Sequence, residues 1–160
     1  IGIKCGPKTN VDDLKSIISV LNPNNTSGKI TLIARFGYGN SEKYLPNMIS
    51  NIDMEGFNVI WSCDPMHGNT RISNNNYKTR TFESIVGELK EHISIHKGKG
   101  TTLGGVHLEM TGQDVTECIG GVDNVEELEL SKSYQTLCDP RLNANQAIEM
   151  AFLISDNLRQ

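Results

Sequence analysis

Strand-like and helix-like segments alternate along almost the whole sequence, and this alternation is what most constrains the fold. Each expected strand is a short run of apolar and β-branched residues. Each expected helix repeats apolar residues at intervals of three and four. The first pair is a strand over residues 1–6 and a helix over 11–21, with Asn10 as the expected N-cap of the helix.

Three further strand–helix pairs complete the pattern. Strands are expected over 29–35, 57–63 and 103–110. Helices are expected over 43–54, with Pro46 in the first turn, over 81–96 and over 144–158. A long loop separates the last strand from the last helix. Four strands, each followed by a helix, indicate an α/β fold with a parallel sheet.

The kind of parallel sheet follows from what is missing after the first strand. A doubly wound nucleotide-binding fold carries a Gly-rich turn there. This sequence has Gly6-Pro7-Lys8 instead, and it contains neither a GxGxxG nor a Walker motif. We therefore expect four βα units of a parallel barrel, with residues 1–160 forming a single domain. The first residue already reads as strand interior, so we expect the true start of the chain to lie upstream.

Composition excludes several classes of protein. The content of 37% hydrophobic and 21% charged residues is that of an ordinary globular protein. A net charge of -4 argues against broad nucleic-acid binding. No apolar stretch is long enough to span a bilayer, and the sequence does not open on a signal peptide. We expect a cytoplasmic protein with no nucleic-acid or membrane partner; a plastid form would need a transit peptide upstream.

The cysteines indicate a reducing environment. They are far apart and form no CxxC pair, which argues against a zinc ribbon, and a disulfide scaffold would be smaller and richer in cysteine. We expect reduced, buried thiols. The four residues are Cys5, Cys63, Cys118 and Cys138.

Charged residues collect at the carboxyl ends of the expected strands, where the active site of a parallel barrel is assembled. Such residues are costly to bury without partners, so packing alone explains this distribution poorly. They are Lys4 in the first strand, Arg35 at the end of the second, Asp64, His67, Lys78 and Arg80 after the third, His107 and Glu109 in the fourth, and Asp139 in the long loop.

These residues divide into two chemical groups. One imidazole and two carboxylates suit Mn²⁺, Fe²⁺, Co²⁺ or Zn²⁺; these are His67, Glu109 and Asp139. Four cations suit phosphate or carboxylate groups; these are Lys4, Arg35, Lys78 and Arg80. A divalent metal beside a cluster of cations indicates a small, multiply anionic, phosphorylated substrate.

Each candidate also has a purely structural interpretation. Arg35 could cap a strand end, and Lys78 could be a solvated residue of an Asn-rich loop. We expect Trp61 to lie in the core and His92 and His96, on the long helix, to face solvent.

Several motifs resemble those of the class II, plant-type, 3-deoxy-D-arabino-heptulosonate 7-phosphate (DAHP) synthase family. They are GIKCGP, LNPNN, ARFG, CDPMHGNT, KTR, GGVHLEMTGQDVTECIGG and CDPRLN. The resemblance runs in order from Gly2 to the final helix. It covers the later strands and helices of the family's barrel, so we expect the chain to be the C-terminal part of such a protein.

The resemblance implies a (β/α)8 TIM barrel and a transferase that condenses phosphoenolpyruvate with erythrose 4-phosphate. The products are DAHP and phosphate, in the first step of the shikimate pathway of aromatic amino acid biosynthesis. It also implies a divalent metal, with Mn²⁺ first and Co²⁺, Fe²⁺ or Zn²⁺ as alternatives. We expect a homo-oligomer formed through the complete chain, and we expect this fragment alone to be inactive.

The resemblance also assigns site residues. The metal ligands fall on His67 of DPMHGNT, Glu109 of GGVHLE and Asp139 of CDPRLN. The phosphoenolpyruvate-binding residues fall on Lys4 and Arg35, and the KTR motif adds Lys78 and Arg80 near the phosphorylated substrates. The catalytic residues are then Lys4, His67 and Glu109. The family's fourth metal ligand, a cysteine, lies in the missing part, and no cysteine here stands in its motif.

Two positions depart from the family pattern. The arginine motif reads RFG, with Phe36 where methionine is expected, and residues 73–77 are rich in asparagine where Pro and Gly are common. The first change conserves volume. Neither change removes a residue that carries the chemistry.

The implied mechanism uses the metal as a Lewis acid on the aldehyde of erythrose 4-phosphate, which C3 of phosphoenolpyruvate attacks. Arg35 and Lys4 would hold the phosphate and carboxylate of phosphoenolpyruvate, water would add at C2, and phosphate would leave. We expect Lys4 also to transfer a proton, because a second cation nearby favours its neutral amine.

Two alternatives stay open at this point. The first is a Schiff-base aldolase on the same barrel, with Lys4 as nucleophile. The second is a non-catalytic half-barrel that binds metal or phosphate only when paired with a missing N-terminal part, because four βα units leave both sheet edges open.

Overall fold

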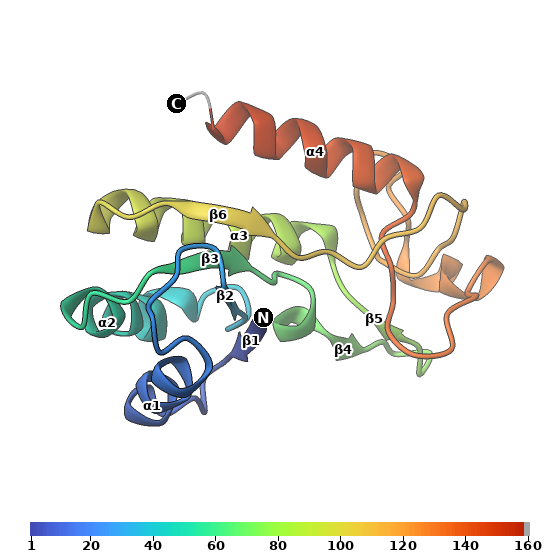
Figure 1. The fold of residues 1–160 in the computed structure, drawn as a ribbon. Coiled ribbons are helices and arrows are strands. Elements are labelled where there is room, and N and C mark those ends of the chain that lie inside the picture. The colour runs from blue at the N-terminus through green and yellow to red at the C-terminus, as the bar shows by residue number, and fades with distance from the viewer. Residues whose placement is uncertain (159–160) are drawn as a thin grey trace. The chain divides into compact units, whose positions relative to one another are not determined.

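The computed structural model describes residues 1–158, and the chain divides into two compact units. The first unit comprises Ile1–Gly68 and Glu88–His107, and the second comprises Asn69–Gly87 and the chain from Leu108 onward. The principal elements, labelled in Figure 1, are β1 (Gly2–Cys5), α1 (Val11–Leu21), β2 (Ile30–Ala34), α2 (Ser41–Met54), β3 (Val59–Cys63), β4 (Arg71–Ile72), β5 (Lys78–Thr79), α3 (Phe82–Lys99), β6 (Leu103–Val106) and α4 (Ala144–Leu158). Two short 3-10 helices, η1 (His67–Asn69) and η2 (Glu127–Lys132), complete them.

The first unit is built on a four-stranded sheet in the order β1-β2-β3-β6. All three strand pairs are parallel, so the expected α/β fold with a parallel sheet is confirmed. The register places Lys4 of β1 beside Ile33 of β2, which in turn lies beside Ser62 of β3. The four strands lie in the sheet in the same order as they occur along the chain.

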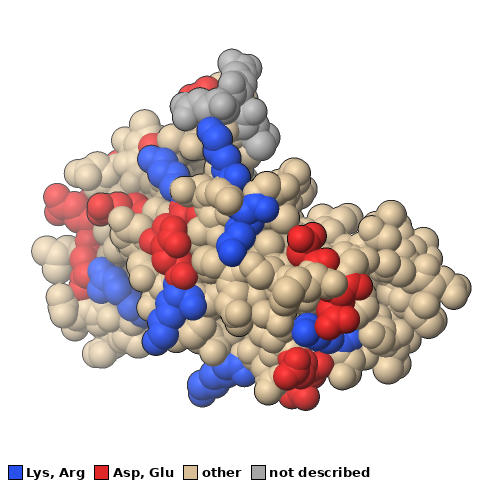
Figure 2. All heavy atoms as spheres, turned by 90° about the vertical axis from the view of Figure 1, so that its left-hand side faces the viewer, with Lys and Arg blue, Asp and Glu red and all other residues tan. Residues whose placement is uncertain are grey.

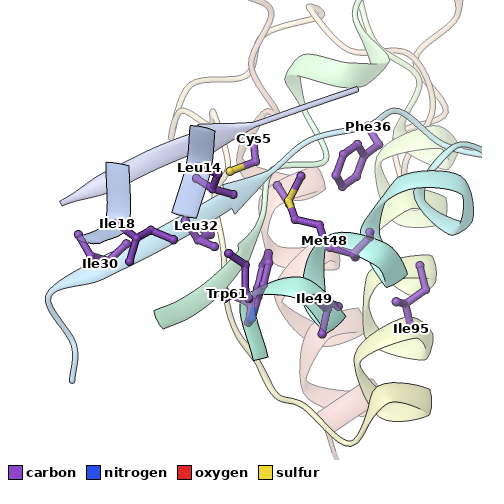
Figure 3. Packing of buried hydrophobic residues seen from close by; sticks show 13 residues of the cluster. Cys5, Leu14, Ile18, Ile30, Leu32, Phe36, Met48, Ile49, Trp61 and Ile95 are labelled. Carbon is purple, nitrogen blue, oxygen red and sulfur yellow. The ribbon is translucent and has the colours of Figure 1, made fainter. Parts of the chain in front are cut away.

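The core of this unit lies on one face of the sheet. Along β2, Ile30, Leu32 and Ala34 are buried, whereas Thr31 and Ile33 between them are only partly so. Apolar side chains of α1, α2 and α3 all pack on the buried face, as Figure 3 shows. These helical residues are Leu14, Ile18, Leu45, Met48, Ile49, Ile52 and Ile95. Each fully buried aliphatic side chain contributes about 1.5–3 kcal/mol. Three helices therefore cover the same face, and Lys4 and Ser62 belong to the opposite one.

Local sequence explains where the first helix begins. The Asn10 side-chain oxygen accepts from the N–H groups of Asp12 and Asp13 at 2.8 and 3.1 Å, which confirms the expected N-cap of α1. The expected start of α2 was wrong. This helix begins at Ser41 rather than at residue 43, so Pro46 lies in its second turn rather than its first.

The other strand and helix predictions were right in type and shifted at their ends. Strands β1, β2 and β3 are each two residues shorter than expected. Helix α3 runs on to Lys99 rather than ending at 96, while α1 and α4 match their expected ranges. The fourth strand ends at Val106, not at residue 110. Beyond it, Met110 forms an isolated bridge with Leu142.

Expectations about individual side chains had mixed outcomes. Trp61 is buried, as expected. The prediction that His92 and His96 face solvent was wrong, because they are 0% and 2% exposed. Their rings lie 5.9 Å from the Phe36 ring and 5.6 Å from the Trp61 ring, respectively. Burial lowers the pKa of His96 to about 4, with a smaller contribution from His92.

The four cysteines are free thiols, as expected. Three are buried, namely Cys5, Cys63 and Cys118, but Cys138 is exposed, so the expectation of burial was wrong there. Burial raises the pKa of Cys5 to about 11 and that of Cys118 to about 12, which makes these thiols unreactive near neutral pH.

The second unit is built from short elements. The antiparallel pair β4–β5 turns at Asn76, whose φ of 64° lies in the left-handed region that Asn tolerates. A parallel bridge joins Thr81 to Ile119, and α4 follows the long loop. Gln146 of α4 donates to the carbonyl oxygens of Cys118 and Gly120 at 3.0 and 2.9 Å, which anchors that loop to the helix.

Acidic and basic side chains lie interspersed on the face of the molecule that Figure 2 displays. None of the helices in the described part of the chain has the length and apolar character needed to cross a membrane.

Candidate active-site residues

In the first unit, Asp64 joins two of the predicted site residues. The carboxylate directly follows β3 and is fully buried. Its Oδ2 accepts a hydrogen bond from the ammonium group of Lys4, and the same atom lies 2.8 Å from Nδ1 of His67. Burial by itself raises the pKa of Asp64, but the hydrogen bonds from Lys4 and His67 outweigh it and hold this pKa below its ordinary value. Asp64 is therefore ionised at neutral pH.

The charge beside Lys4 differs from the expectation. The sequence led us to expect a second cation as its neighbour, but its hydrogen-bond partner is the Asp64 carboxylate. The hydrogen bond to Asp64 fixes where the side-chain nitrogen of Lys4 lies.

An open cavity of about 490 Å³ lies at the carboxyl ends of β1 and β2. Lys4, Lys8 and Arg35 all line it, together with the backbone of Gly6 and Gly68. Three cations around one cavity favour an anionic ligand. Lys8 was missed by the sequence analysis, although its place just after a strand that already carries Lys4 was a usable signal.

The backbone that follows Arg35 is held by Glu88 of α3. This buried carboxylate accepts from the N–H groups of Phe36 and Gly37 at 2.7 and 3.0 Å. Gly37 has a φ of 84°, and a Cβ added to Gly68 would lie only 2.4 Å from the nitrogen of Gly37. The loops after β2 and β3 can approach this closely only because both residues are glycine.

His107 also lies in the first unit. Its N–H donates to the carbonyl oxygen of Cys63 at 2.7 Å, which continues the ladder between β3 and β6. The His107 ring centroid lies 6.3 Å from that of His67.

In the second unit, Arg80 lies among the predicted carboxylates. It is fully buried, and its Nη1 is 2.5 Å from Glu109. Its Nη2 is 3.9 Å from Asp139, and its Nε donates to Thr70 Oγ1 at 2.9 Å. A buried guanidinium needs such partners. Arg80 therefore brings the Glu109 and Asp139 carboxylates together.

Lys78 forms an ion pair with Asp139. The hydrogen bond to Asp139 raises the pKa of Lys78, so the ammonium form is favoured. An open cavity of about 350 Å³ in this unit is lined by Glu109, Cys138, Asp139 and Arg141 among others.

The loop that carries Asp139 is held by another buried carboxylate, Glu117. It accepts from the N–H groups of Gln135 and Thr136 at 3.1 and 2.8 Å, and from the N–H of Arg141 at 2.8 Å. The Arg141 guanidinium also binds it, through Nε at 2.9 Å and Nη2 at 2.6 Å. Burial raises the pKa of Glu117, but the bonds from Arg141 and the backbone lower it below its ordinary value.

Each unit thus gathers its own share of the predicted residues. Lys4, Arg35 and His67 belong to the first unit. The remaining four, Lys78, Arg80, Glu109 and Asp139, belong to the second. The predicted metal ligands are divided between the units, so their assignment as one set stays a prediction.

Comparison with known proteins places these residues in a family. The family described as the Class-II DAHP synthetase family matches residues 1–155. The phospho-2-dehydro-3-deoxyheptonate aldolase AroG of Mycolicibacterium smegmatis is 44% identical over 159 residues, which cover 99% of this chain and 34% of the relative. A Neurospora crassa phospho-2-dehydro-3-deoxyheptonate aldolase is 46% identical over 162 residues, which cover 100% of this chain and 34% of the relative. The Streptomyces coelicolor protein of the same name is 41% identical over 159 residues, which cover 99% of this chain and 35% of the relative.

The chain spans about a third of the length of these relatives. The family match nevertheless runs through all four strands of the sheet, the buried carboxylates Asp64, Glu88 and Glu117, and the loops that carry the predicted site residues. The chain therefore belongs to the class-II DAHP synthetase family.

Proposed function

We propose that the complete protein containing this chain condenses phosphoenolpyruvate with erythrose 4-phosphate to give DAHP and phosphate. This is the first step of the shikimate pathway. The named relatives are phospho-2-dehydro-3-deoxyheptonate aldolases, which supports this reaction. The observation that carries the proposal is the cavity lined by Lys4, Lys8 and Arg35, with Asp64 joining Lys4 to His67.

We further propose that the four parallel strands form part of a (β/α)8 barrel. Helices α1, α2 and α3 all pack on one face of the sheet, whereas a doubly wound sheet carries helices on both faces. In a barrel the face opposite the helices is the interior. Lys4 belongs to that opposite face, near the carboxyl ends of the strands, where barrel enzymes bind their substrates.

The proposed metal ligands are His67, Glu109 and Asp139, with Mn²⁺ first and Co²⁺, Fe²⁺ or Zn²⁺ as alternatives. One imidazole and two carboxylates suit these ions. Asp64 lies against Nδ1 of His67, so Nε2 is the ring nitrogen that Asp64 does not occupy. The Arg80 guanidinium lies 2.5 Å from Glu109 and 3.9 Å from Asp139, so it holds both carboxylates close to each other. When bound, the metal would supply Lewis-acid polarisation of the aldehyde.

The cations of the chain would bind and orient the substrates. In the proposal, Arg35 and Lys4 hold the phosphate and carboxylate of phosphoenolpyruvate, so that its C3 faces the aldehyde carbon. Lys78 is partly exposed and is proposed to contact the phosphorylated substrates. Arg80 is proposed as their second contact in the KTR motif, and its guanidinium also binds Thr70 and Glu109. The cytoplasmic location and the homo-oligomer stay predictions.

Phosphate release from phosphoenolpyruvate by the full-length protein tests the function. Release that needs both erythrose 4-phosphate and Mn²⁺, and that stops with EDTA, is the expected result. Release without the aldose would instead indicate a phosphatase. Trapping of a substrate adduct by borohydride would favour the Schiff-base aldolase, for which Lys4 must be a free amine.

The same assay distinguishes the half-barrel alternative. If residues 1–160 alone release no phosphate and the full-length protein does, then this chain contributes binding groups and depends on the remaining part. Equal inactivity of the full-length protein would remove the proposed reaction altogether.

A further inference from the structure

We propose that Asp64 is a positioning residue that keeps the imidazole proton of His67 on Nδ1. The other ring nitrogen, Nε2, is then presented to the divalent metal. The same carboxylate orients the ammonium group of Lys4. This inference rests on the proposed function, because it takes His67 as a metal ligand and Lys4 as a substrate-binding residue.

The position of Asp64 is fixed by the sheet. Its N–H donates to the carbonyl oxygen of Ala34 at 2.8 Å, which extends the β2–β3 ladder by one residue. Its Oδ1 accepts from the N–H groups of Met66 and His67 at 3.1 and 3.2 Å. The side chain is 0% exposed. A carboxylate held by backbone on both sides is a rigid support for the groups that it contacts.

The proton on His67 follows from the chemistry of its partner. An ionised carboxylate only accepts hydrogen bonds, and Nδ1 of His67 lies 2.8 and 3.0 Å from the two oxygens of Asp64. Nδ1 must therefore carry the proton. A neutral imidazole has one N–H, so the lone pair that a metal needs is on Nε2. Carboxylates that fix the tautomer of a metal-binding histidine in this way contribute about 10–100-fold to metal affinity.

Lys4 makes the charge of Asp64 necessary. The ammonium group donates to Oδ2, the atom that also lies against His67. An asparagine at position 64 would keep an oxygen for the two backbone N–H groups. It would, however, turn an NH₂ group toward two donors, Lys4 Nζ and His67 Nδ1–H. The imidazole can relieve this conflict by moving its proton to Nε2, which removes the lone pair from the metal-facing nitrogen.

The test compares Asp64→Asn with wild type in the full-length protein. The first readout is the pair of ring ¹⁵N chemical shifts of His67 in the metal-free protein, which report the tautomer. The second is the Mn²⁺ dissociation constant without substrates. We expect Nδ1–H in wild type, Nε2–H in the variant, and Mn²⁺ binding weakened about 10–100-fold.

Glu91→Gln is the matched control. Glu91 is a carboxylate of the same unit that accepts a backbone N–H, from Gly39 at 2.8 Å. The control removes the same charge and leaves the groups around His67 in place, so Mn²⁺ affinity should stay at the wild-type value. Asp64→Asn also leaves the charge of Lys4 facing an amide. The double variant Lys4→Met/Asp64→Asn removes that charge and so tests the effect on His67 alone. It should show the same loss of Mn²⁺ affinity.

The outcomes separate this inference from the proposed function. A wild-type protein with its His67 proton on Nε2, or a double variant that binds Mn²⁺ as wild type does, would overturn the role of Asp64. Neither readout involves a substrate. A protein that shows the expected tautomer and Mn²⁺ loss but releases no phosphate would retain the positioning role and lose the synthase reaction.

Discussion

Glu117 and Arg141 form a two-point ion pair in which Nε of Arg141 lies 2.9 Å from one carboxylate oxygen and Nη2 lies 2.6 Å from the other. The pair closes the loop that carries Asp139, since Glu117 also accepts three backbone N–H groups of that loop. A carboxylate in the interior of the second unit thus determines where a proposed metal ligand lies.

Replacing Glu117 with Gln should destabilise the protein and weaken Mn²⁺ binding. The neutral amide leaves the Arg141 guanidinium without its counter-charge. Breaking a buried pair costs about 3–5 kcal/mol, and the partial exposure of Arg141 places this case at about 3 kcal/mol. Urea unfolding measures the change. Glu127→Gln, which removes an exposed pair with Arg71, is the control and should leave the unfolding midpoint unchanged. A stable Glu117→Gln protein would show that the pair does not hold the loop.

The same carboxylate predicts a pH dependence of stability. The folded-state pKa of Glu117 lies below the ordinary value of 4.5, so the folded protein binds this proton less readily than the unfolded chain. The stabilisation is then full above pH 4.5 and is lost as the pH falls through the lowered pKa. The pKa of Asp64 is also lowered, so its contribution to stability is likewise lost as the pH falls. Unfolding midpoints should fall between about pH 6 and pH 3, and less steeply in Glu117→Gln. If the unfolding midpoints of wild type and Glu117→Gln fell equally steeply with pH, Glu117 would not be a source of the acid sensitivity.

Replacing Glu88 with Met should weaken phosphoenolpyruvate binding. Glu88 accepts the N–H groups of Phe36 and Gly37, directly after Arg35, and methionine leaves both donors unpaired. Each buried, unpaired donor costs about 1–3 kcal/mol, so the loop should shift and KM for phosphoenolpyruvate should rise about 10-fold. Glu88→Gln retains an oxygen at the same place and should change KM much less. Equal effects of the two variants would mean that the charge, and not the acceptor, matters.

Replacing Gly68 with Ala should displace the loop that carries His67. The added Cβ would lie 2.4 Å from the Gly37 nitrogen, a distance that forces one of the two loops to move. Overpacking of this kind costs about 1–3 kcal/mol. Thermal unfolding and Mn²⁺ titration measure the two consequences. Gly98→Ala adds a methyl group in open space within α3 and should be neutral or slightly stabilising. An unchanged Mn²⁺ affinity in Gly68→Ala would show that His67 tolerates the shift.

Most of the fold could be predicted from local patterns. Helix α1 was predicted to the residue because Asn10 and the acidic first turn mark its start, and α4 matched as well. The parallel sheet followed from the alternation of strands and helices. The strand ends and the start of α2 were less accurate, because hydrogen bonding across the sheet, and not residue type, decides where a ladder stops.

The polar interior of α3 was missed. Glu88, His92 and His96 repeat every four residues and are buried, as are Ile85 and Leu89 of the same helix, yet the two histidines were expected to face solvent. Their burial depends on partners far away in sequence, such as the N–H groups after Arg35 and the rings of Phe36 and Trp61. The four-residue spacing was the one available signal.

Candidate site residues were predicted by their place after strands, but their partners were not. Lys4 and Asp64 are 60 positions apart, and only the strand register brings them together. For this reason the sequence suggested a cation beside Lys4 where the structure has a carboxylate. Arg80 was likewise predicted as a substrate contact, and its bonds to Glu109 and Thr70 are visible only in the folded chain.

The most direct test of the account is phosphate release by the full-length protein, measured for wild type and His67→Ala with and without Mn²⁺ and erythrose 4-phosphate. We expect release by wild type only when both are present. We expect His67→Ala to bind Mn²⁺ more weakly and to release no phosphate above background. Metal-dependent release by His67→Ala at the wild-type rate would contradict the assignment of His67 and, with it, the proposed metal centre.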